Sequence, residues 1–394
     1  MFPNRTVLIS GASIAGPAVA YWLHRHGFAT TIVERAPALR EGGQAVDFRG
    51  DAHLGVLSKM GVLDQLAAVQ THMGEQWLVD ATGAPIVRLP AAMMSGDLEV
   101  LRGDLCRILY HATRGTTEYR FGDHITALAD TPHGVEVQFA HAPAQTFDLV
   151  LGADGLHSGV RALAFGDESR FLRHLGYYVA GFTLPNHGQL RRRGVTFSVP
   201  GRGVNLSNAG APDDARALLV FASDPLRYDR HDVDAQKRLV ADRFAGLGWE
   251  VPRVIDALRE AKDLYFDAIA RVDVDRYATG RIALIGDAAY GGTLGGQGSG
   301  AAIVGAYVLA GELAAAGGDL RIGFARYEAR MRRYATRCQN GAAHAGPFFA
   351  PRSRLGLWLR DRIYGLLASP RLAFVFRAMV RSAANHIELE PYAV

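Results

Sequence analysis

The sequence predicts an α/β protein in which a Rossmann-like domain is joined to an inserted domain with a mostly antiparallel sheet and to a C-terminal helical segment. Three observations support this fold class. Residues Thr6–Arg35 have the pattern of a strand, a tight turn, a helix and a second strand. Short strand-like runs separated by glycine, proline and asparagine fill residues 171–222. An apolar strand returns at Arg281–Asp287, before a glycine-rich loop and the apolar helix Ala301–Leu313.

Length and composition describe an ordinary globular protein. The chain has 394 residues, enough for two or three domains, with 49% hydrophobic and 21% charged residues. Cys106 and Cys338 lack a C-x-x-C partner, so we expect reduced thiols, no metal site and a cytoplasmic protein. Because strand-like residues begin at Thr6, we expect no signal peptide, and no uninterrupted apolar run reaches the roughly 20 residues that span a bilayer.

The charge balance argues against a nucleic-acid partner. The net charge is +4, and the only basic triplet is Arg191–Arg193, which lies between expected strands without aromatic residues around it. We interpret the triplet as a solvated loop. We therefore expect no nucleic-acid partner. We also expect no membrane association and either a monomer or a homodimer.

The strand–turn–helix unit at the N-terminus predicts a dinucleotide site. Gly11 allows a tight turn, Gly16 allows the helix to pack closely on the strand, and the helix N-terminus offers free N–H groups to a pyrophosphate. Serine replaces the middle glycine of G-x-G-x-x-G, and the alternative is an ordinary tight turn. An acidic residue at the end of the second strand favours FAD or NAD over NADP. The residues expected to hold the dinucleotide here are Gly11, Ser13, Ile14, Ala15, Gly16, Glu34 and Arg35.

The middle of the chain alternates between helical and strand patterns. Residues 36–50 are predicted as a glycine-bearing loop, followed by helices near Asp51–Met60 and Val62–Gln70. A hairpin is predicted over Glu75–Arg88, and a helix after Leu98 with Arg102 at its start. Two strands are predicted on either side of His133–Gly134, and one buried strand over Gln145–Gly152.

The second domain is predicted from strands with helices after them. The expected strands are Tyr177–Leu184, Val195–Val199, Val204–Asn208, Arg216–Phe221 and Leu264–Val272, and the expected helices are Asp232–Leu247 and Val251–Glu260. Tyr177, Tyr178, Phe182 and Phe197 either line an aromatic pocket or pack as core residues, and core packing is the better interpretation.

Three motifs in order connect the chain to a known family. The N-terminal turn is followed by D-G-x-x-S-x-V-R at Asp154–Arg161 and by G-R-x-x-L-x-G-D-A-A at Gly280–Ala289. Together they resemble the signatures of the flavin-dependent aromatic hydroxylases. This family is typified by para-hydroxybenzoate hydroxylase and includes antibiotic-tailoring and tetracycline-inactivating monooxygenases. The resemblance covers residues 1 to about 340.

The resemblance implies bound FAD and assigns residues to it. Gly286 and Asp287 are expected at the flavin ribityl chain, because a carboxylate after an apolar strand can accept its hydroxyl hydrogen bonds. The N–H groups of Gly298, Ser299 and Gly300 can stabilise negative charge on the reduced flavin ring. Arg102 matches a family arginine that reaches the cofactor.

Other assignments keep an alternative. Asp154 and Arg161 resemble a segment placed near the FAD pyrophosphate, although a helix cap and a salt bridge are the alternative. The Gly42–Asp47 loop resembles the family segment beside the flavin ring; there Asp47 and Arg49 either contact substrate or form a loop ion pair. Tyr290 stands where relatives often have histidine, and Thr293 and Leu294 stand where a proline is common, which puts the shape of the flavin-side pocket in doubt.

The resemblance implies a single-component FAD-dependent monooxygenase. With NAD(P)H and O2 it hydroxylates an aromatic or polyketide-like small molecule through a flavin C4a-hydroperoxide, and no catalytic acid or base is assigned because the cofactor supplies the chemistry. The alternatives are an FAD-dependent epoxidase or reductase of an isoprenoid or polyene substrate, and a non-catalytic flavoprotein. A flavin halogenase is rejected, because the four tryptophans lie far apart and no W-x-W-x-I-P stretch is present.

The expected domains follow the motifs. Residues 1–73, 99–170 and 277–345 form the FAD-binding domain, residues 74–98 and 171–276 form the substrate domain, and residues 346–394 form the C-terminal helical segment. Within that last segment Leu355, Leu357, Trp358, Ile363, Leu366 and Leu367 recur at helical spacing among arginines. This pattern favours a helix that packs across its own domain over one that lies on a membrane surface.

Overall fold

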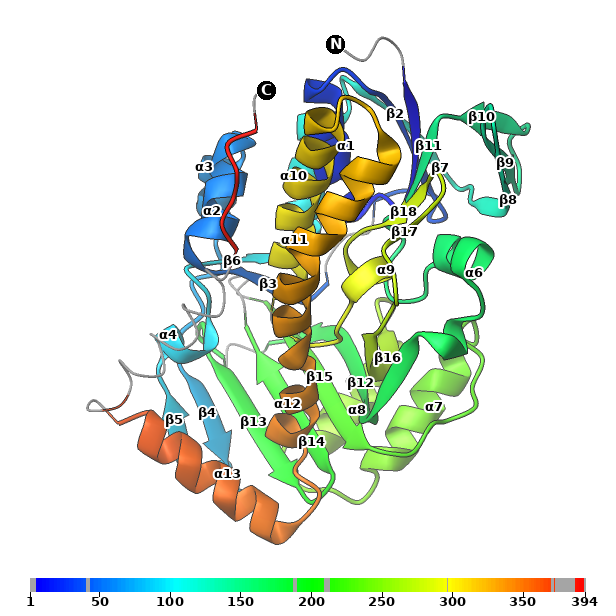
Figure 1. Ribbon diagram of the computed structural model, residues 1–394. Helices are drawn as coiled ribbons and strands as arrows, with labels where there is room; N and C mark the ends of the chain where they lie inside the picture. Colours follow the sequence, from blue (N-terminus) through cyan, green and yellow to red (C-terminus); the bar gives the residue numbers. More distant parts are fainter. Residues whose placement is uncertain are drawn as a thin grey trace.

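Figure 1 shows the computed structural model, which describes residues 5–39, 43–186, 190–208, 213–295, 297–369, 372 and 387–392. Two large sheets dominate it, one near the chain ends and one on the far side of the molecule. The fold is mixed α/β, as the sequence predicts.

The first large sheet, here called the parallel sheet, has the order β17-β18-β11-β1-β2-β7 within the described residues. Its strands are β1 (Thr6–Ser10), β2 (Ala29–Glu34), β7 (Thr117–Phe121), β11 (Leu149–Gly152), β17 (Ala278–Thr279) and β18 (Ile282–Leu284). All neighbours pair in parallel except β17 with β18. The carboxyl ends of β1, β2, β11 and β18 therefore meet at one edge, where open α/β sheets bind ligands.

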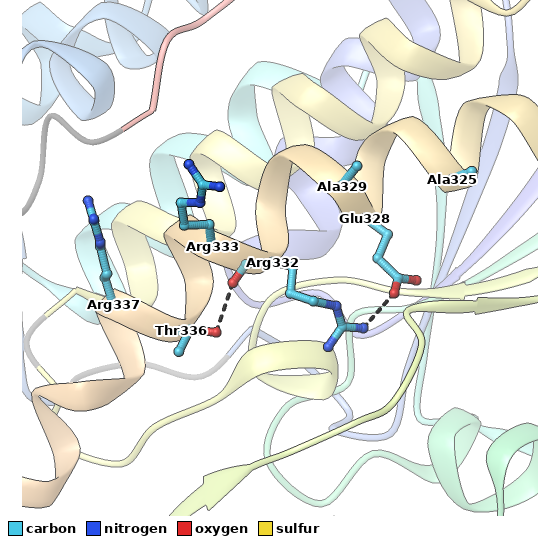
Figure 2. A pocket seen from close by; sticks show the side chains of 7 residues that line it. All are labelled: Ala325, Glu328, Ala329, Arg332, Arg333, Thr336 and Arg337. Atoms are coloured by element: carbon cyan, nitrogen blue, oxygen red, sulfur yellow. Dashed lines mark hydrogen bonds and ion pairs between the residues drawn. The ribbon is translucent and has the colours of Figure 1, made fainter.

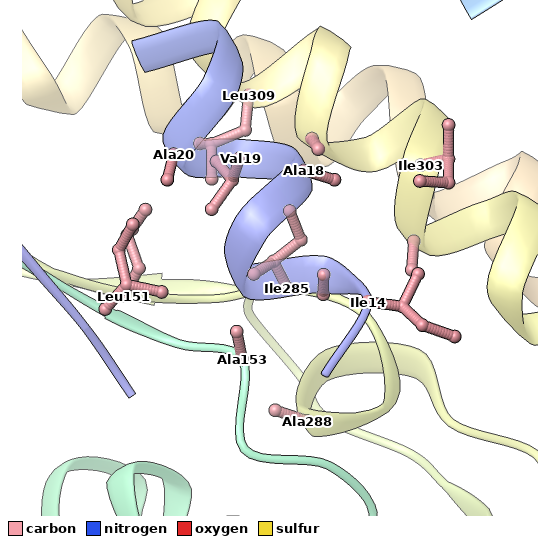
Figure 3. Packing of buried hydrophobic residues seen from close by; sticks show 14 of the residues in the cluster. Ile14, Ala18, Val19, Ala20, Leu151, Ala153, Ile285, Ala288, Ile303 and Leu309 are labelled. Carbon is pink, nitrogen blue, oxygen red and sulfur yellow. The ribbon is translucent and has the colours of Figure 1, made fainter. Parts of the chain in front are cut away.

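Helices α1 (Ala15–Arg25), α10 (Gly298–Ala315) and α11 (Leu320–Asn340) pack together beside this sheet. Figure 3 shows small side chains of α1, such as Ala18, between the strands and α10, with Ile303 and Leu309 on α10. Among the described helices, α10 alone is long and apolar enough to span a bilayer, and 78% of it is buried inside the protein. It is the central core helix. The remaining helices around this sheet are α2 (Gly50–Lys59), α3 (Leu63–Ala68), α5 (Arg102–Thr113), α6 (Gly159–Phe165) and α9 (Asp287–Tyr290).

The second large sheet, here called the antiparallel sheet, has the order β16-β12-β15-β14-β13-β4-β5 in the part of the chain described. Its strands are β4 (Gln76–Val79), β5 (Pro85–Leu89), β12 (Leu172–Pro185), β13 (Gly194–Val199), β14 (Arg202–Ser207), β15 (Asp214–Ala222) and β16 (Tyr265–Val272). Helices α7 (Val233–Phe244) and α8 (Val251–Glu260) share its core. Tyr178, Phe182 and Phe197 are buried in that core, as the packing interpretation predicts.

Two smaller sheets differ from the sequence predictions. The expected single strand over Gln145–Gly152 is wrong: β10 (Gln145–Phe147) joins β9 (Gly134–Phe139) and β8 (Ile125–Thr131), whereas β11 joins the parallel sheet. The chain changes sheet at Asp148, whose carboxylate accepts hydrogen bonds from the Thr6 N–H and hydroxyl.

The predicted loop before residue 50 contains β3 (Ala45–Phe48), which pairs with β6 (Leu98–Leu101). Residues 40–42 of that loop lie outside the described residues. Both strands are only four residues long, so neither gives a clear alternating pattern. A short 3₁₀ turn (Glu168–Arg170) and helix α4 (Ala91–Met94) complete this part of the chain.

The C-terminal region contains α12 (Ala342–Phe349) and α13 (Arg354–Leu367). Helix α13 packs on β5 and β13, and Tyr364 contacts Phe348. Arg360 is buried and donates to the Ser198 hydroxyl and to the Phe348 carbonyl. The predicted packing of this helix on its own domain is thus present on one face. The other face exposes Leu355, Trp358, Leu359, Ile363 and Leu366.

Candidate functional site

The turn after β1 brings two glycines and one neighbouring strand into close contact. Gly11 has φ +108°, and its N–H donates to the Val33 carbonyl at 2.8 Å. A Cβ on Gly16 would lie 1.9 Å from the Gly11 carbonyl oxygen, so no larger residue fits without moving the helix. Helix α1 therefore starts as close to the sheet as a backbone can approach.

The N-terminus of α1 has no side-chain cap. Ile14 is the N-cap residue, and the helix continues from Ala15 with its first N–H groups available to an anion. Ser13 lies at this opening, where its hydroxyl accepts a 2.9 Å hydrogen bond from Arg102 and lies 3.5 Å from the Cys106 sulfur. The arginine that begins α5 is thus held against the first turn.

Glu34 ends β2 and is already engaged by backbone groups. Its two oxygens accept 2.9 Å hydrogen bonds from the N–H groups of Ala12 and Ala36. Each carboxylate oxygen can accept a second hydrogen bond, so capacity remains for ribose hydroxyls. Arg35 follows as an exposed residue.

Asp287 lies after β18 and opens α9. The N-cap of α9 is Gly286, and within the described residues the Asp287 carboxylate accepts no hydrogen bond. It is exposed to solvent, but surrounding protein raises its pKa, and the nearby Arg102 charge opposes that rise. In the described part of the chain, this carboxylate therefore has no hydrogen-bond donor at the ligand-binding edge of the sheet.

The start of α10 faces this carboxylate. A Cβ on Gly298 would lie 3.4 Å from Asp287 Oδ1, and Gly300 packs against the imidazole of His53. Gln297 is the N-cap residue and makes no side-chain cap hydrogen bond, so the N–H groups of Gly298 and Ser299 are not capped. Gly296, in the same predicted loop, lies outside the described residues.

Asp154 and Arg161 are held inside their own segment. Asp154 accepts hydrogen bonds from the Ser158 hydroxyl, the Val160 N–H at 3.0 Å and the Ser10 hydroxyl at 3.3 Å. Arg161 is fully buried and donates to the carbonyls of Ala288 and Leu156. These contacts match the alternative of a helix cap, and a pyrophosphate role for Asp154 stays a prediction.

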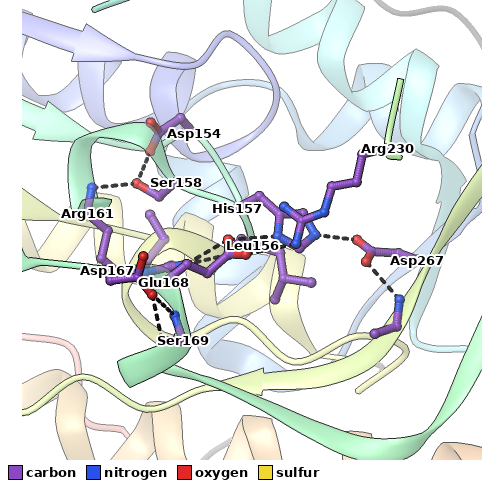
Figure 4. A network of polar contacts seen from close by, with 12 residues as sticks. Asp154, Leu156, His157, Ser158, Arg161, Asp167, Glu168, Ser169, Arg230 and Asp267 are labelled. Carbon is purple, nitrogen blue, oxygen red and sulfur yellow. Dashed lines mark hydrogen bonds and ion pairs between the residues drawn. The ribbon is translucent and has the colours of Figure 1, made fainter. Parts of the chain in front are cut away.

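His157 joins the two large sheets (Figure 4). It follows β11, and its ring nitrogens lie 2.8 Å from Glu168 and 2.8 Å from Asp267 of β16. Burial alone would lower the pKa of His157, but the hydrogen bonds to Asp267 and Glu168 outweigh burial and raise the pKa to about 9. The imidazolium is therefore charged at neutral pH.

Replacing His157 with glutamine is expected to reduce stability in a pH-dependent way. The pKa is raised on folding, so the stabilisation is complete below pH 6.5, decreases above it and is lost as the pH rises through 9. We expect a loss in unfolding free energy on the order of 3 kcal/mol at pH 6 and a much smaller loss at pH 10. Urea unfolding of both proteins at these pH values measures the difference.

The control is His133→Gln, because His133 is exposed in the β8–β9 turn. This variant should unfold like the parent at both pH values. A loss for His157→Gln that is the same at pH 6 and pH 10 contradicts the charged ion pair.

A polar cavity of about 160 Å³ lies between the β3–β6 pair and the antiparallel sheet. It is lined by Gln44, Ala45, Met73, Gly74, Gln76, Ser95, Glu99, Asn205, Ser207, Arg216 and Phe349. Amide, hydroxyl, carboxyl and guanidinium groups line this cavity together with a few apolar side chains. Such a mixture orients a small ligand that carries several oxygens.

A second hollow is a shallow groove of about 760 Å³ along α11. Figure 2 shows its lining: Arg332 is paired with Glu328, and the Thr336 hydroxyl donates to the Arg332 carbonyl. All its lining residues come from this one helix. Despite its size it is an open helix surface, and the polar cavity, which is the more enclosed of the two, is the better ligand site.

Comparison with known proteins decides the family. An FAD-binding domain model matches residues 4–169. A flavin-dependent monooxygenase of Legionella longbeachae serogroup 1 (strain NSW150) is 34% identical over 403 residues, covering 100% of this chain and 99% of the relative. The chain belongs to the flavin-dependent monooxygenase family. This FAD-dependent oxidoreductase family uses NAD(P)H as co-substrate and acts on small molecules with O2.

Two further comparisons extend across the chain. An uncharacterised protein of Mycobacterium tuberculosis (strain H37Rv) is 43% identical over 342 residues, covering 85% of this chain and 92% of that protein. The crystal structure of the tetracycline destructase Tet(55) superposes with a TM-score of 0.84 at 33% identity and covers all of both chains. This monooxygenase therefore shares its whole architecture, including both large sheets, with that enzyme.

Three notable residues of this monooxygenase were not assigned from the sequence. His157 is inside a motif, but its partner Glu168 follows 11 residues later, outside the motif, and its partner Asp267 lies 110 residues away. Glu99 is buried in β6, and a lone acidic residue within the apolar run Leu98–Leu101 was the signal available. Tyr265 begins β16, and its hydroxyl lies 3.4 Å from Asp267.

Proposed function

We propose that this monooxygenase is a single-component enzyme that hydroxylates an aromatic or polyketide-like small molecule. The observation that carries the proposal is the Asp287 carboxylate, which lacks a hydrogen-bond partner within the described residues and faces Gly298 at the uncapped start of α10. A polyhydroxylated chain would supply the missing donors. The residues present fit FAD, because the pyrophosphate, the ribose, the ribityl chain and the reduced ring would each meet a matching group at this edge.

The roles follow from the chemistry of the groups. The first turn of α1, from Gly11 to Gly16 through Ser13, Ile14 and Ala15, would hold the pyrophosphate. Glu34 would accept ribose hydroxyls, with Arg35 beside it. Gly286 and Asp287 would hold the ribityl chain, and the N–H groups of Gly298, Ser299 and Gly300 would stabilise negative charge on the ring. Arg102 would add a positive charge.

The bound flavin supplies the redox and oxygen chemistry. The chain's own residues bind it, orient one oxygen-bearing part of the substrate at the polar cavity and exclude water. Asp154 would also belong to the cofactor site, because it holds the segment Asp154–Arg161, which the resemblance places near the FAD pyrophosphate. The first domain would comprise residues 1–73, 99–170 and 277–345; residues 74–98 and 171–276 would hold the substrate; residues 346–394 would form the C-terminal segment.

The substrate class is supported by the likeness to the tetracycline destructases Tet(51) and Tet(55), at 31% and 33% identity over the whole chain. Polycyclic polyketides with phenol and enol groups are therefore the first compounds to test, and tetracycline is the first of these. We propose a cytoplasmic monomer or homodimer that uses no membrane or nucleic-acid partner.

Substrate-dependent NAD(P)H oxidation is the test. The purified protein should be yellow and retain FAD through gel filtration. NAD(P)H oxidation should be slow alone and accelerate with a phenolic or polycyclic compound, and the product should gain one oxygen atom from isotopically labelled O2. A protein that stays colourless after incubation with FAD contradicts the assignment. An unchanged rate across a broad panel contradicts the substrate class.

A further inference from the structure

A carboxyl pair contributes one member, Glu99, to the wall of the polar cavity. Asp47 of β3 and Glu99 of β6 are directly opposite in the antiparallel register, so their side chains share one face of the strand pair. Glu99 lines the cavity and is 8% exposed. Asp47 is half-buried, and two like charges directly opposite one another repel, which favours one proton between them.

The partners of the two carboxyls differ. Asp47 accepts a 2.8 Å hydrogen bond from the Arg49 guanidinium and a 3.0 Å bond from the Gly96 N–H. Glu99 accepts a hydrogen bond from the Thr71 hydroxyl. The negative charge is therefore better stabilised on Asp47, so the first proton that the pair binds goes to Glu99, and Glu99 is the free base once that proton has left.

Burial and then the Asp47 charge raise the pKa of Glu99 to about 7, although the Thr71 hydroxyl opposes the rise. Other charged or titratable groups around the pair are few in the described chain. Arg49 binds Asp47, Arg216 lines the same cavity, and Asp97 accepts from the Gly50 N–H. His53, which accepts from the Arg49 N–H, is buried with its pKa lowered to about 4 and stays neutral near pH 7.

We propose that Glu99 accepts the hydroxyl proton of a phenol or enol bound in this cavity, with Asp47 as the positioning residue that sets its proton affinity. The proposal rests on the proposed function. The substrate O–H bond breaks, its proton moves to a Glu99 oxygen, and the electron pair stays on the substrate oxygen. The resulting anion is the more nucleophilic form, and Arg216 is the cation at the cavity that stabilises it.

The test compares three variants of the FAD-loaded enzyme. Glutamine at position 99 can still accept from Thr71 and can donate to Asp47, so Glu99→Gln should fold. With a compound that stimulates NAD(P)H oxidation, it should lower kcat/KM at pH 8 by at least about 100-fold and remove the titration near pH 7. Asp47→Asn should move that titration to lower pH. Glu136→Gln, at an exposed position of β9, is the control and should match the parent.

Infrared spectroscopy gives a second readout that needs no turnover. The parent should show a protonated carboxyl band that disappears near pH 7, is absent in Glu99→Gln and shifts to lower pH in Asp47→Asn. A band that titrates below pH 5, or a Glu99→Gln rate profile equal to the parent's, overturns the proposal. If no compound stimulates NAD(P)H oxidation, the proposed substrate class fails instead, and the infrared titration still decides whether Glu99 holds the proton.

Discussion

Gly16→Ala is expected to abolish FAD retention and to lower the unfolding free energy by roughly 1–3 kcal/mol. The added methyl group would lie 1.9 Å from the Gly11 carbonyl oxygen, and the obstacle is backbone, which cannot rotate away. The first turn of α1 must then move off β1. Its N–H groups lose their position toward the pyrophosphate, so flavin absorbance should be missing after gel filtration.

The matched control is Gly55→Ala in α2. A Cβ there meets nothing within 4 Å, and alanine is a better helix former, so stability should rise by about 0.5–1 kcal/mol with FAD retained. Urea unfolding and flavin absorbance measure both variants. A Gly16→Ala protein that keeps its FAD would place the dinucleotide away from this turn.

Asp287→Ala is expected to weaken FAD binding at least about tenfold, equal to 1.4 kcal/mol, with the far-UV circular dichroism spectrum preserved. The Asp287 carboxylate makes no hydrogen bond within the described residues, so its removal breaks no contact there that supports the fold. It does remove the acceptor that we assign to the ribityl hydroxyls. Titration of the apoprotein with FAD, followed by flavin fluorescence, gives the affinity.

Asp319→Ala separates this effect from the loss of a helix cap. Asp319 is the N-cap of α11, and its carboxylate accepts from the Ile322 N–H at 3.1 Å. Its loss should cost about 0.5–2 kcal/mol of stability and leave FAD affinity unchanged. If Asp287→Ala behaves like Asp319→Ala, the carboxylate has no role at the flavin.

Local patterns predicted most elements, because they depend on neighbours in the sequence. The strand–turn–helix–strand unit and the hairpin over β4 and β5 have clear periods and glycine turns, and both were found. The short strands β3 and β6 were not predicted, and the two strands β10 and β11 were predicted as a single strand over Gln145–Gly152. The break at Asp148 depends on Thr6, which is 142 residues away in the sequence.

The same distinction applies to the site. Glu34 was predicted from the strand–turn–helix–strand motif, and Asp287 from the family resemblance and its place after an apolar strand. The structure brings both residues to the carboxyl edge of the parallel sheet. Pairings between distant segments have no local signal. The partnership of Asp47 with Glu99 and of His157 with Asp267 requires a register between strands that only the folded chain defines.

The pairing of distant strands has a consequence for synthesis on the ribosome. The β4–β5 hairpin ends at Leu89 but pairs in parallel with β13, which begins at Gly194, about 105 residues later. At roughly 5–20 residues per second, the hairpin emerges on the order of 5–20 s before its partner strand exists. Strand β11 waits longer for β18. Until its partner strand is made, each of these edges lacks the neighbour that covers it in the folded protein, and unpaired strand edges are the sites at which incomplete chains aggregate.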